Sequence, residues 1–222
     1  MRRNRRSGGS AEYGSVTVEG MVYRKSERVL KQLEGKREGI VAAARALILK
    51  GGFGEAPIAA VAKLAGVATG TVYRYFPSKA DLLAEVVRQT SQHELDVIIA
   101  IARTRAAPDE RFERAMRTFL SRAIRGYRLA YLLLIEPIDA TVWQARIGYR
   151  RALAAVLADL IREAIADGTF REQDAEIVAA AVVGAMNENL IAVLSPDGPD
   201  PERSLDSLVD SLTTFCLAAV AR

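Results

Sequence analysis

The stretch from residue 57 to residue 83 constrains the fold of this chain more than any other part. It reads PIAAVAKLAGVATGTVYRYFPSKADLL and predicts two short helices that meet at a tight turn and lead into a longer third helix. A small residue at Ala62 lets a second helix approach closely, and Gly66 can take the left-handed backbone that such a turn requires. Val72 follows at the spacing expected of the residue that packs between the two helices. The pattern therefore predicts a helix-turn-helix, a unit that places one short helix in the major groove of DNA.

The rest of the chain has a helical pattern throughout. Ser78 and Asp81 match a capping box, with Asp in place of the usual Glu, and predict a helix that runs to about Arg103. An earlier helix is expected from Arg37 to the Gly51-Gly52 pair. Later amphipathic helices are expected near residues 108–124, 125–135, 138–167, 172–194 and 200–221. No alternating strand pattern of useful length interrupts them, so the sequence predicts an all-α fold.

Charge is divided unevenly along the chain. The formal net charge is +4, but residues 1–92 hold 16 Lys and Arg against 8 Asp and Glu, a net of +8, whereas residues 93–222 have a net of −4. A basic front half suits a polyanionic partner, although uneven surface charge alone would give the same count. The first 20 residues carry four arginines and a Ser-Gly-Gly-Ser run and are expected to form a disordered arm, either a solvated tail or a DNA contact.

Cysteine content and hydropathy indicate the compartment. Cys216 is the single cysteine, which excludes a disulfide within the chain and predicts a reducing, cytoplasmic environment. The longest apolar stretch, residues 177–186, is shorter than the roughly 20 residues that span a bilayer, so no membrane partner is expected. No metal-ligand spacing is present, and no cofactor is predicted.

Residues 65–83 resemble the most specific motif of the TetR family of bacterial transcriptional regulators, and the resemblance extends over about residues 37–87. It implies a three-helix DNA-binding domain joined through a long fourth helix to a C-terminal helical domain that binds a ligand and forms a dimer. The corresponding boundaries are a basic arm at 1–34, the helix-turn-helix domain at 35–84, and the effector-binding and dimerisation domain at 85–222.

The resemblance also implies which residues meet DNA. The recognition helix would begin with Thr69, Gly70 and Thr71, whose backbone N–H groups and hydroxyls can meet phosphates or base edges. The remaining candidates are the phosphate contacts Tyr73 and Lys79, and the base-edge contacts Arg74 and Tyr75. Tyr75 has an alternative, which is packing against the fourth helix.

Two further partners follow from the resemblance. The last two helices, about 172–194 and 200–221, are expected to form a homodimer that binds a palindromic operator. A small hydrophobic or amphipathic effector is expected within the C-terminal domain. Its candidate contacts are Phe119, Tyr127, Tyr131, Trp143, Tyr149, Met186, Asn187 and Asn189. Acidic residues such as Glu136 would favour a cationic ligand and basic ones such as Arg146 an anionic one, and the sequence leaves this choice open.

Other function classes receive less support. An all-α enzyme would need a catalytic group, and the single histidine, His93, has no nucleophile motif near it. No catalytic residue is predicted. A DNA-packaging protein without sequence preference remains the alternative to a ligand-responsive repressor, and competition with random DNA would separate the two.

Overall fold

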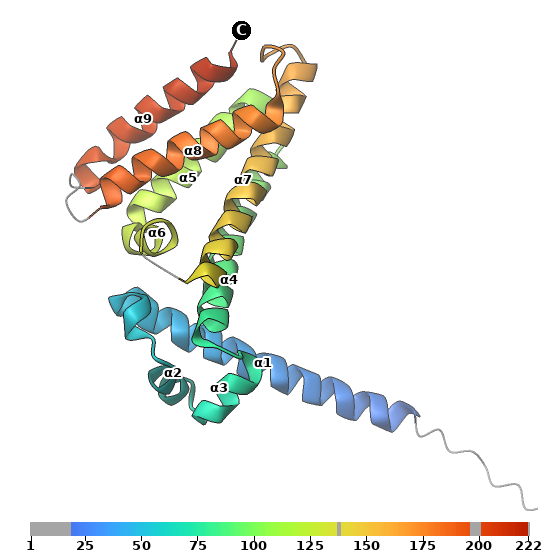
Figure 1. The fold of residues 1–222 in the computed structure, drawn as a ribbon. Coiled ribbons are helices and arrows are strands. Elements are labelled where there is room, and N and C mark those ends of the chain that lie inside the picture. The colour runs from blue at the N-terminus through green and yellow to red at the C-terminus, as the bar shows by residue number, and fades with distance from the viewer. Residues whose placement is uncertain (1–18, 137–138, 196–200, 222) are drawn as a thin grey trace, which may run out of the picture. The chain divides into compact units, whose positions relative to one another are not determined.

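The computed structural model describes residues 19–136, 139–195 and 201–221, which are almost wholly helical (Figure 1). Apart from one short 3-10 turn at Phe53–Glu55, the regular elements are α-helices. Their bounds are α1 Glu19–Gly51, α2 Ile58–Ala65, α3 Thr69–Tyr75, α4 Lys79–Ala102, α5 Pro108–Arg125, α6 Tyr127–Leu134, α7 Ala140–Ala166, α8 Ala175–Leu194 and α9 Pro201–Val220. Extended pairing in the described ranges is limited to an isolated bridge between Phe170 and Ala221. The all-α prediction is confirmed.

Helix ends follow the local signals closely, with one difference. The helix expected from Arg37 begins earlier, because α1 opens at Glu19 and continues to Gly51. The predicted disordered arm lies outside the described residues for positions 1–18, and its last two positions belong to α1. Charged residues without apolar periodicity can still extend a helix that packing has already nucleated further along, since propagation is easier than nucleation.

The turns of the helix-turn-helix have the predicted backbone. Gly66 ends α2 with φ 67° and ψ 32°, the left-handed conformation, and its N–H donates to the carbonyls of Ala62 and Lys63. At the start of α4 the capping box is complete, because the Ser78 hydroxyl accepts from the Asp81 N–H and the Asp81 carboxylate accepts from the Ser78 N–H. Ala68 precedes α3 and offers no side-chain cap.

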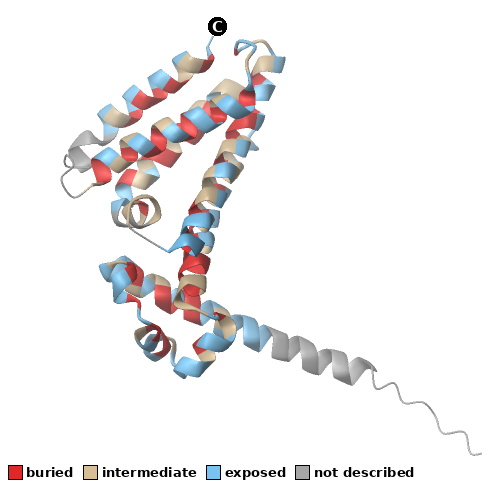
Figure 2. Cartoon of the chain, in the orientation of Figure 1, coloured by how far each residue is buried: buried red, intermediate tan, exposed pale blue. Residues whose placement is uncertain are grey.

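The buried hydrophobic residues form two clusters. Figure 2 colours the buried positions along the helices red. One cluster joins α1, α2 and α3 to the first turns of α4, with Ile40, Val61 and Val72 wholly buried. The other joins α5, α7, α8 and α9 to the later turns of α4. Because α4 contributes to both clusters, displacement along this helix affects both.

Helices α8 and α9 each leave apolar residues exposed. Along α8 the exposed stripe includes Ile177, which is 67% exposed, together with Ala181 and Gly184, and Phe215 on α9 is 62% exposed. By length and composition α8 could cross a membrane, so this helix is more apolar than its sequence pattern led us to expect. One side of α8 packs in the second cluster, which accounts for part of this character, and the exposed stripe accounts for the rest.

Candidate DNA-binding face and effector cavity

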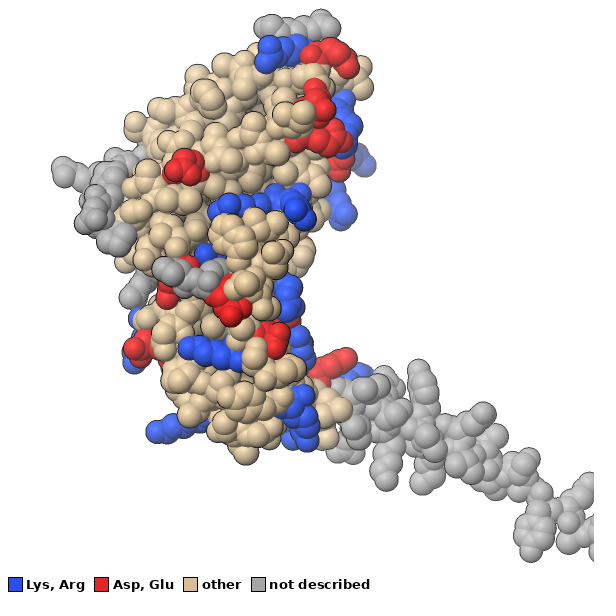
Figure 3. All heavy atoms as spheres, in the orientation of Figure 1, with Lys and Arg blue, Asp and Glu red and all other residues tan. Residues whose placement is uncertain are grey.

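Helix α3 is anchored by one side chain and leaves the opposite side open. Val72 is fully buried against the cluster formed with α1, α2 and α4. Thr69, Gly70 and Arg74 are exposed, and the Tyr73 ring is 50% exposed. In the view of Figure 3, Lys and Arg side chains project around this part of the chain. The geometry leaves a short helix with hydroxyl, phenol and guanidinium groups directed away from the core.

The other three predicted DNA contacts are less exposed. Thr71 and Lys79 are half-buried, and Lys79 is the first residue of α4. Tyr75 is also half-buried and packs against the first cluster, with its hydroxyl oxygen buried and without a hydrogen-bond partner among the described residues. The Arg74 guanidinium lies 5.5 Å from the Tyr75 ring centroid, a cation–π distance. For Tyr75 this placement favours packing, the second of the two sequence interpretations.

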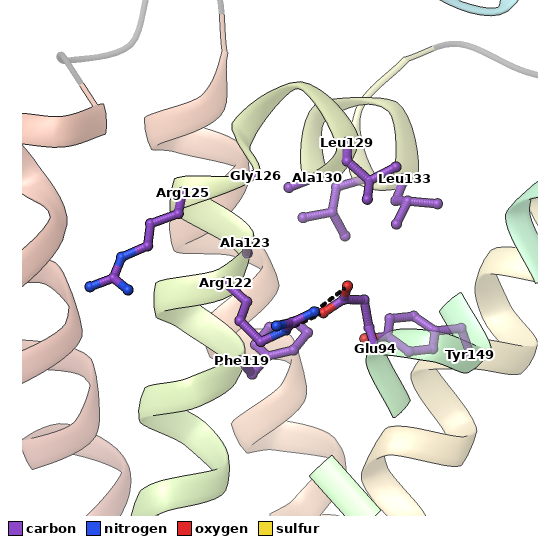
Figure 4. Close-up of a pocket in the computed structure, with 11 residues that line it drawn as sticks. Glu94, Phe119, Arg122, Ala123, Arg125, Gly126, Leu129, Ala130, Leu133 and Tyr149 are labelled. Atoms are coloured by element: carbon purple, nitrogen blue, oxygen red, sulfur yellow. Dashed lines mark hydrogen bonds and ion pairs between the residues drawn. The ribbon is translucent and has the colours of Figure 1, made fainter. Parts of the chain in front are cut away.

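A cavity of about 390 Å³ lies among α4, α5, α6 and α7 (Figure 4). Its volume falls within the range of about 300–1,000 Å³ that small-molecule sites occupy. Most of the wall is apolar and comes from Phe119 and Ala123 on α5 and from Leu129, Ala130, Leu133 and Leu134 on α6. Such a wall suits a ligand with an apolar body.

A single ion pair supplies most of the cavity's polarity. Arg122 donates through Nε and Nη2 to the two carboxylate oxygens of Glu94, at 2.7 and 2.9 Å. The hydrogen bond with Glu94 raises the pKa of Arg122, so the guanidinium remains charged. Tyr149 completes the wall, and burial raises the pKa of its hydroxyl, with the Glu94 charge adding to the shift. The phenol therefore stays protonated and can donate a hydrogen bond to a ligand.

The predicted effector residues divide between this cavity and other places. Phe119 and Tyr149 line it. Tyr127 and Trp143 are 53% and 43% exposed, and Trp143 lies under the guanidinium of Arg150. The others are away from the described lining: Tyr131 is half-buried on α6, Met186 is in the second core cluster, Asn187 is buried, and Asn189 donates to the Ala185 carbonyl.

Glu94, Arg122 and the α6 leucines were not among the residues predicted from the sequence. Glu94 and Arg122 lie 28 positions apart on different helices, and both resemble ordinary solvated charges when read alone. The apolar run of α6 offered a usable signal, because an eight-residue helix that ends in three successive leucines is expected to cover an apolar space.

Two family profiles match the chain. The profile described as "Bacterial regulatory proteins, tetR family" matches residues 40–86, and the one described as "Tetracyclin repressor-like, C-terminal domain" matches residues 105–218, more than half of the chain. The chain belongs to the TetR family. It is a DNA-binding transcription regulator with an N-terminal helix-turn-helix and a C-terminal helical domain.

Individual relatives that are named as regulators agree with this assignment. The fatty acid metabolism regulator protein of Bacillus subtilis is 23% identical over 168 residues, which cover 72% of this chain and 84% of that protein. The transcriptional repressor KstR of Rhodococcus jostii is 48% identical, but over only 52 residues, 23% of this chain and 24% of that protein.

Solved structures of transcriptional regulators share the fold. FadR of Bacillus subtilis in complex with stearoyl-CoA is 21% identical with a TM-score of 0.65, covering 80% of this chain and 97% of that one. A transcriptional regulator from Saccharomonospora viridis in complex with choline is 23% identical with a TM-score of 0.69, covering 85% and 99%. These two ligands differ in charge and size, so the ligand of this chain has to be argued from its own cavity.

Proposed function

We propose that this protein is a homodimeric repressor that binds a palindromic operator through α3 and releases it when an amphipathic effector occupies the cavity of Phe119, Arg122 and Tyr149. The exposed side of α3, opposite the buried Val72, carries the DNA-binding half of the proposal. Thr69, Gly70, Thr71, Tyr73, Arg74 and Lys79 are the proposed contacts. The basic first half of the chain supports a polyanionic partner. The DNA-binding domain is proposed to span residues 35–84 and the effector domain residues 85–222, acting in the cytoplasm.

Dimerisation through α8 and α9 is proposed from the apolar residues that the two helices leave exposed. Ile177 and Phe215 are among these residues, and Ala181 and Gly184 leave α8 smooth enough for a second helix to approach closely. A two-fold dimer places two copies of α3 about 34–36 Å apart, which matches half-sites one turn apart on DNA. Phe215→Glu should convert the dimer to a monomer in light scattering, whereas Leu64→Glu, on an exposed position of α2, should leave it dimeric.

The cavity favours an effector with an anionic end over a cationic one. Glu94 is already neutralised by Arg122, so it offers little to a cation. Arg122 keeps Nη1, which donates to none of the described residues, and Arg125 adds a second positive charge to the lining, with its guanidinium directed away from the pair (Figure 4). A carboxylate could therefore bind beside the ion pair without breaking it, with an alkyl chain against the α6 leucines.

Operator binding tests the DNA half of the proposal. Footprinting on DNA flanking the protein's own gene should reveal a palindromic protected site, bound at least about a thousandfold more tightly than random DNA. A packaging protein would show little difference between the two.

Lys79→Ala should weaken binding to all sequences. It should also reduce the slope of log affinity against log salt concentration by about 0.9 per contact. Arg151→Ala, which removes an exposed charge on α7, should leave that slope unchanged.

Base preference separates Arg74 from the phosphate contacts. If Arg74 grips a guanine, Arg74→Ala should relax preference at one base pair by about 1–3 kcal/mol. Uniform weakening across operator variants would instead make it a phosphate contact.

For the effector half of the proposal, palmitate should raise the melting temperature of the protein and lower operator occupancy. Arg122→Gln should reduce both effects.

A further inference from the structure

Helix α6 contacts both the effector cavity and the core of the DNA-binding domain. Leu129, Ala130 and Leu134 line the cavity. Leu133 lines it too, and the same side chain packs against the cluster that holds Val72 and Phe53. If a ligand moved α6, the packing of the DNA-binding core would therefore change as well.

The residue that follows α6 and its C-cap holds the turn between α1 and α2. The Phe53 N–H donates to Glu136 Oε1 at 2.9 Å, and Phe53 is only 6% exposed. Gly52 sits at φ 86°, and a Cβ built there would lie 2.8 Å from the same carboxylate oxygen. Only glycine permits both this backbone conformation and this close approach. The Glu136 carboxylate therefore packs tightly against the α1–α2 turn, and neither group can shift without changing this contact.

Glu136 is itself held from α7. Arg146 Nη2 donates to the Glu136 carbonyl at 3.0 Å, and the Arg146 side chain is almost fully buried. Burial and the neighbouring Arg150 lower the pKa of Arg146 to about 10, while the Glu136 charge acts in the opposite direction. The Glu136 charge therefore helps to keep this buried guanidinium protonated, which ties the end of α6 to α7.

We infer that Glu136 is the positioning residue through which occupancy of the cavity reaches the helix-turn-helix. This inference rests on the proposed effector cavity, and it identifies the contact that transmits ligand binding to the DNA-binding helices. A ligand in the cavity packs against Leu129, Leu133 and Leu134, so the position of α6 depends on whether the cavity is filled. A shift of about 1 Å at Glu136 stretches the bond to Phe53 beyond hydrogen-bond length. The α1–α2 turn then loses the contact that orients it, and the position of α3 changes with it.

A cavity-filling substitution tests this without knowledge of the ligand. Ala123→Trp places a large side chain among the α6 leucines. We expect it to weaken operator binding by about tenfold and to accelerate hydrogen exchange at the Phe53 amide. In a Glu136→Ala background, the same tryptophan should change operator affinity by less than about twofold, because the connection is already absent. Glu136→Gln keeps the acceptor oxygen and should restore most of the effect.

Control variants distinguish transmission through Glu136 from a general loss of structure. Ala155→Trp adds the same bulk at an exposed position of α7 and should change neither readout. Ala130→Phe is a second, smaller filling variant if the Ala123 protein melts far below the parent. Equal weakening by Ala123→Trp with and without Glu136 would overturn the inference, as would unchanged exchange at Phe53. The exchange readout needs no DNA, so failure to find an operator would count against the proposed function alone.

Discussion

Substitution of Gly66 measures how much of the helix-turn-helix depends on one backbone conformation. Gly66 has φ 67° and ψ 32°, and a Cβ at this position would meet no heavy atom within 4 Å. Steric overlap with neighbours is therefore absent, and the whole effect of Gly66→Ala arises from the left-handed backbone, about 1–2 kcal/mol. Reduced entropy of the unfolded chain offsets about 0.4–1 kcal/mol of this. The expected net loss is roughly 1 kcal/mol.

Gly39 provides a matched control. It lies within α1 and a Cβ there also meets nothing within 4 Å, but its backbone is helical. Gly39→Ala should therefore raise the free energy of unfolding by about 0.5–1 kcal/mol. Gly66→Asn should fall between the parent and Gly66→Ala, since asparagine tolerates the left-handed region better than alanine.

Urea denaturation followed by circular dichroism measures both changes, and the protein concentration is held fixed because the proposed dimerisation would make stability depend on it. The two alanine variants should differ by roughly 1.5–2 kcal/mol, with equal denaturant slopes. If Gly66→Ala stabilises the protein as Gly39→Ala does, the turn does not need glycine and the reasoning is wrong.

Three further outcomes are expected. Phe112 is wholly buried and meets Phe170 edge-on at 5.6 Å, so Phe112→Ala should lower the free energy of unfolding by about 3–5 kcal/mol, against less than about 0.5 kcal/mol for Leu64→Ala at an exposed site. Ser78→Ala removes the α4 cap and should cost about 1 kcal/mol in the same measurement, and no change would mean that the capping box does not stabilise α4. Burial raises the pKa of the Cys216 thiol to about 11, so only about one thiol in a thousand is ionised at pH 8 and alkylation should be slow, rising tenfold per pH unit up to pH 11. Fast alkylation of the folded protein at pH 8 would show that the thiol is accessible.

The local features of the fold were accessible from sequence because their causes are local. Gly66, the Ser78–Asp81 capping box and the Gly51-Gly52 pair act within a few residues of themselves, and each stands where the structure ends or begins a helix. The start of α1 was missed, because its first part lacks the apolar periodicity that marks a packed helix.

The sequence by itself therefore determined the helical class, the helix-turn-helix and the order of the elements, since these follow from periodicity and from caps that neighbouring residues supply. Tertiary structure alone decided that Tyr149 lines the cavity while Tyr127 faces solvent, and that Glu94 pairs with Arg122. It also decided that Glu136 meets Phe53, 83 positions away. Such contacts depend on how whole helices pack, and the angle of a packed helix is set by all its neighbours together rather than by any short pattern.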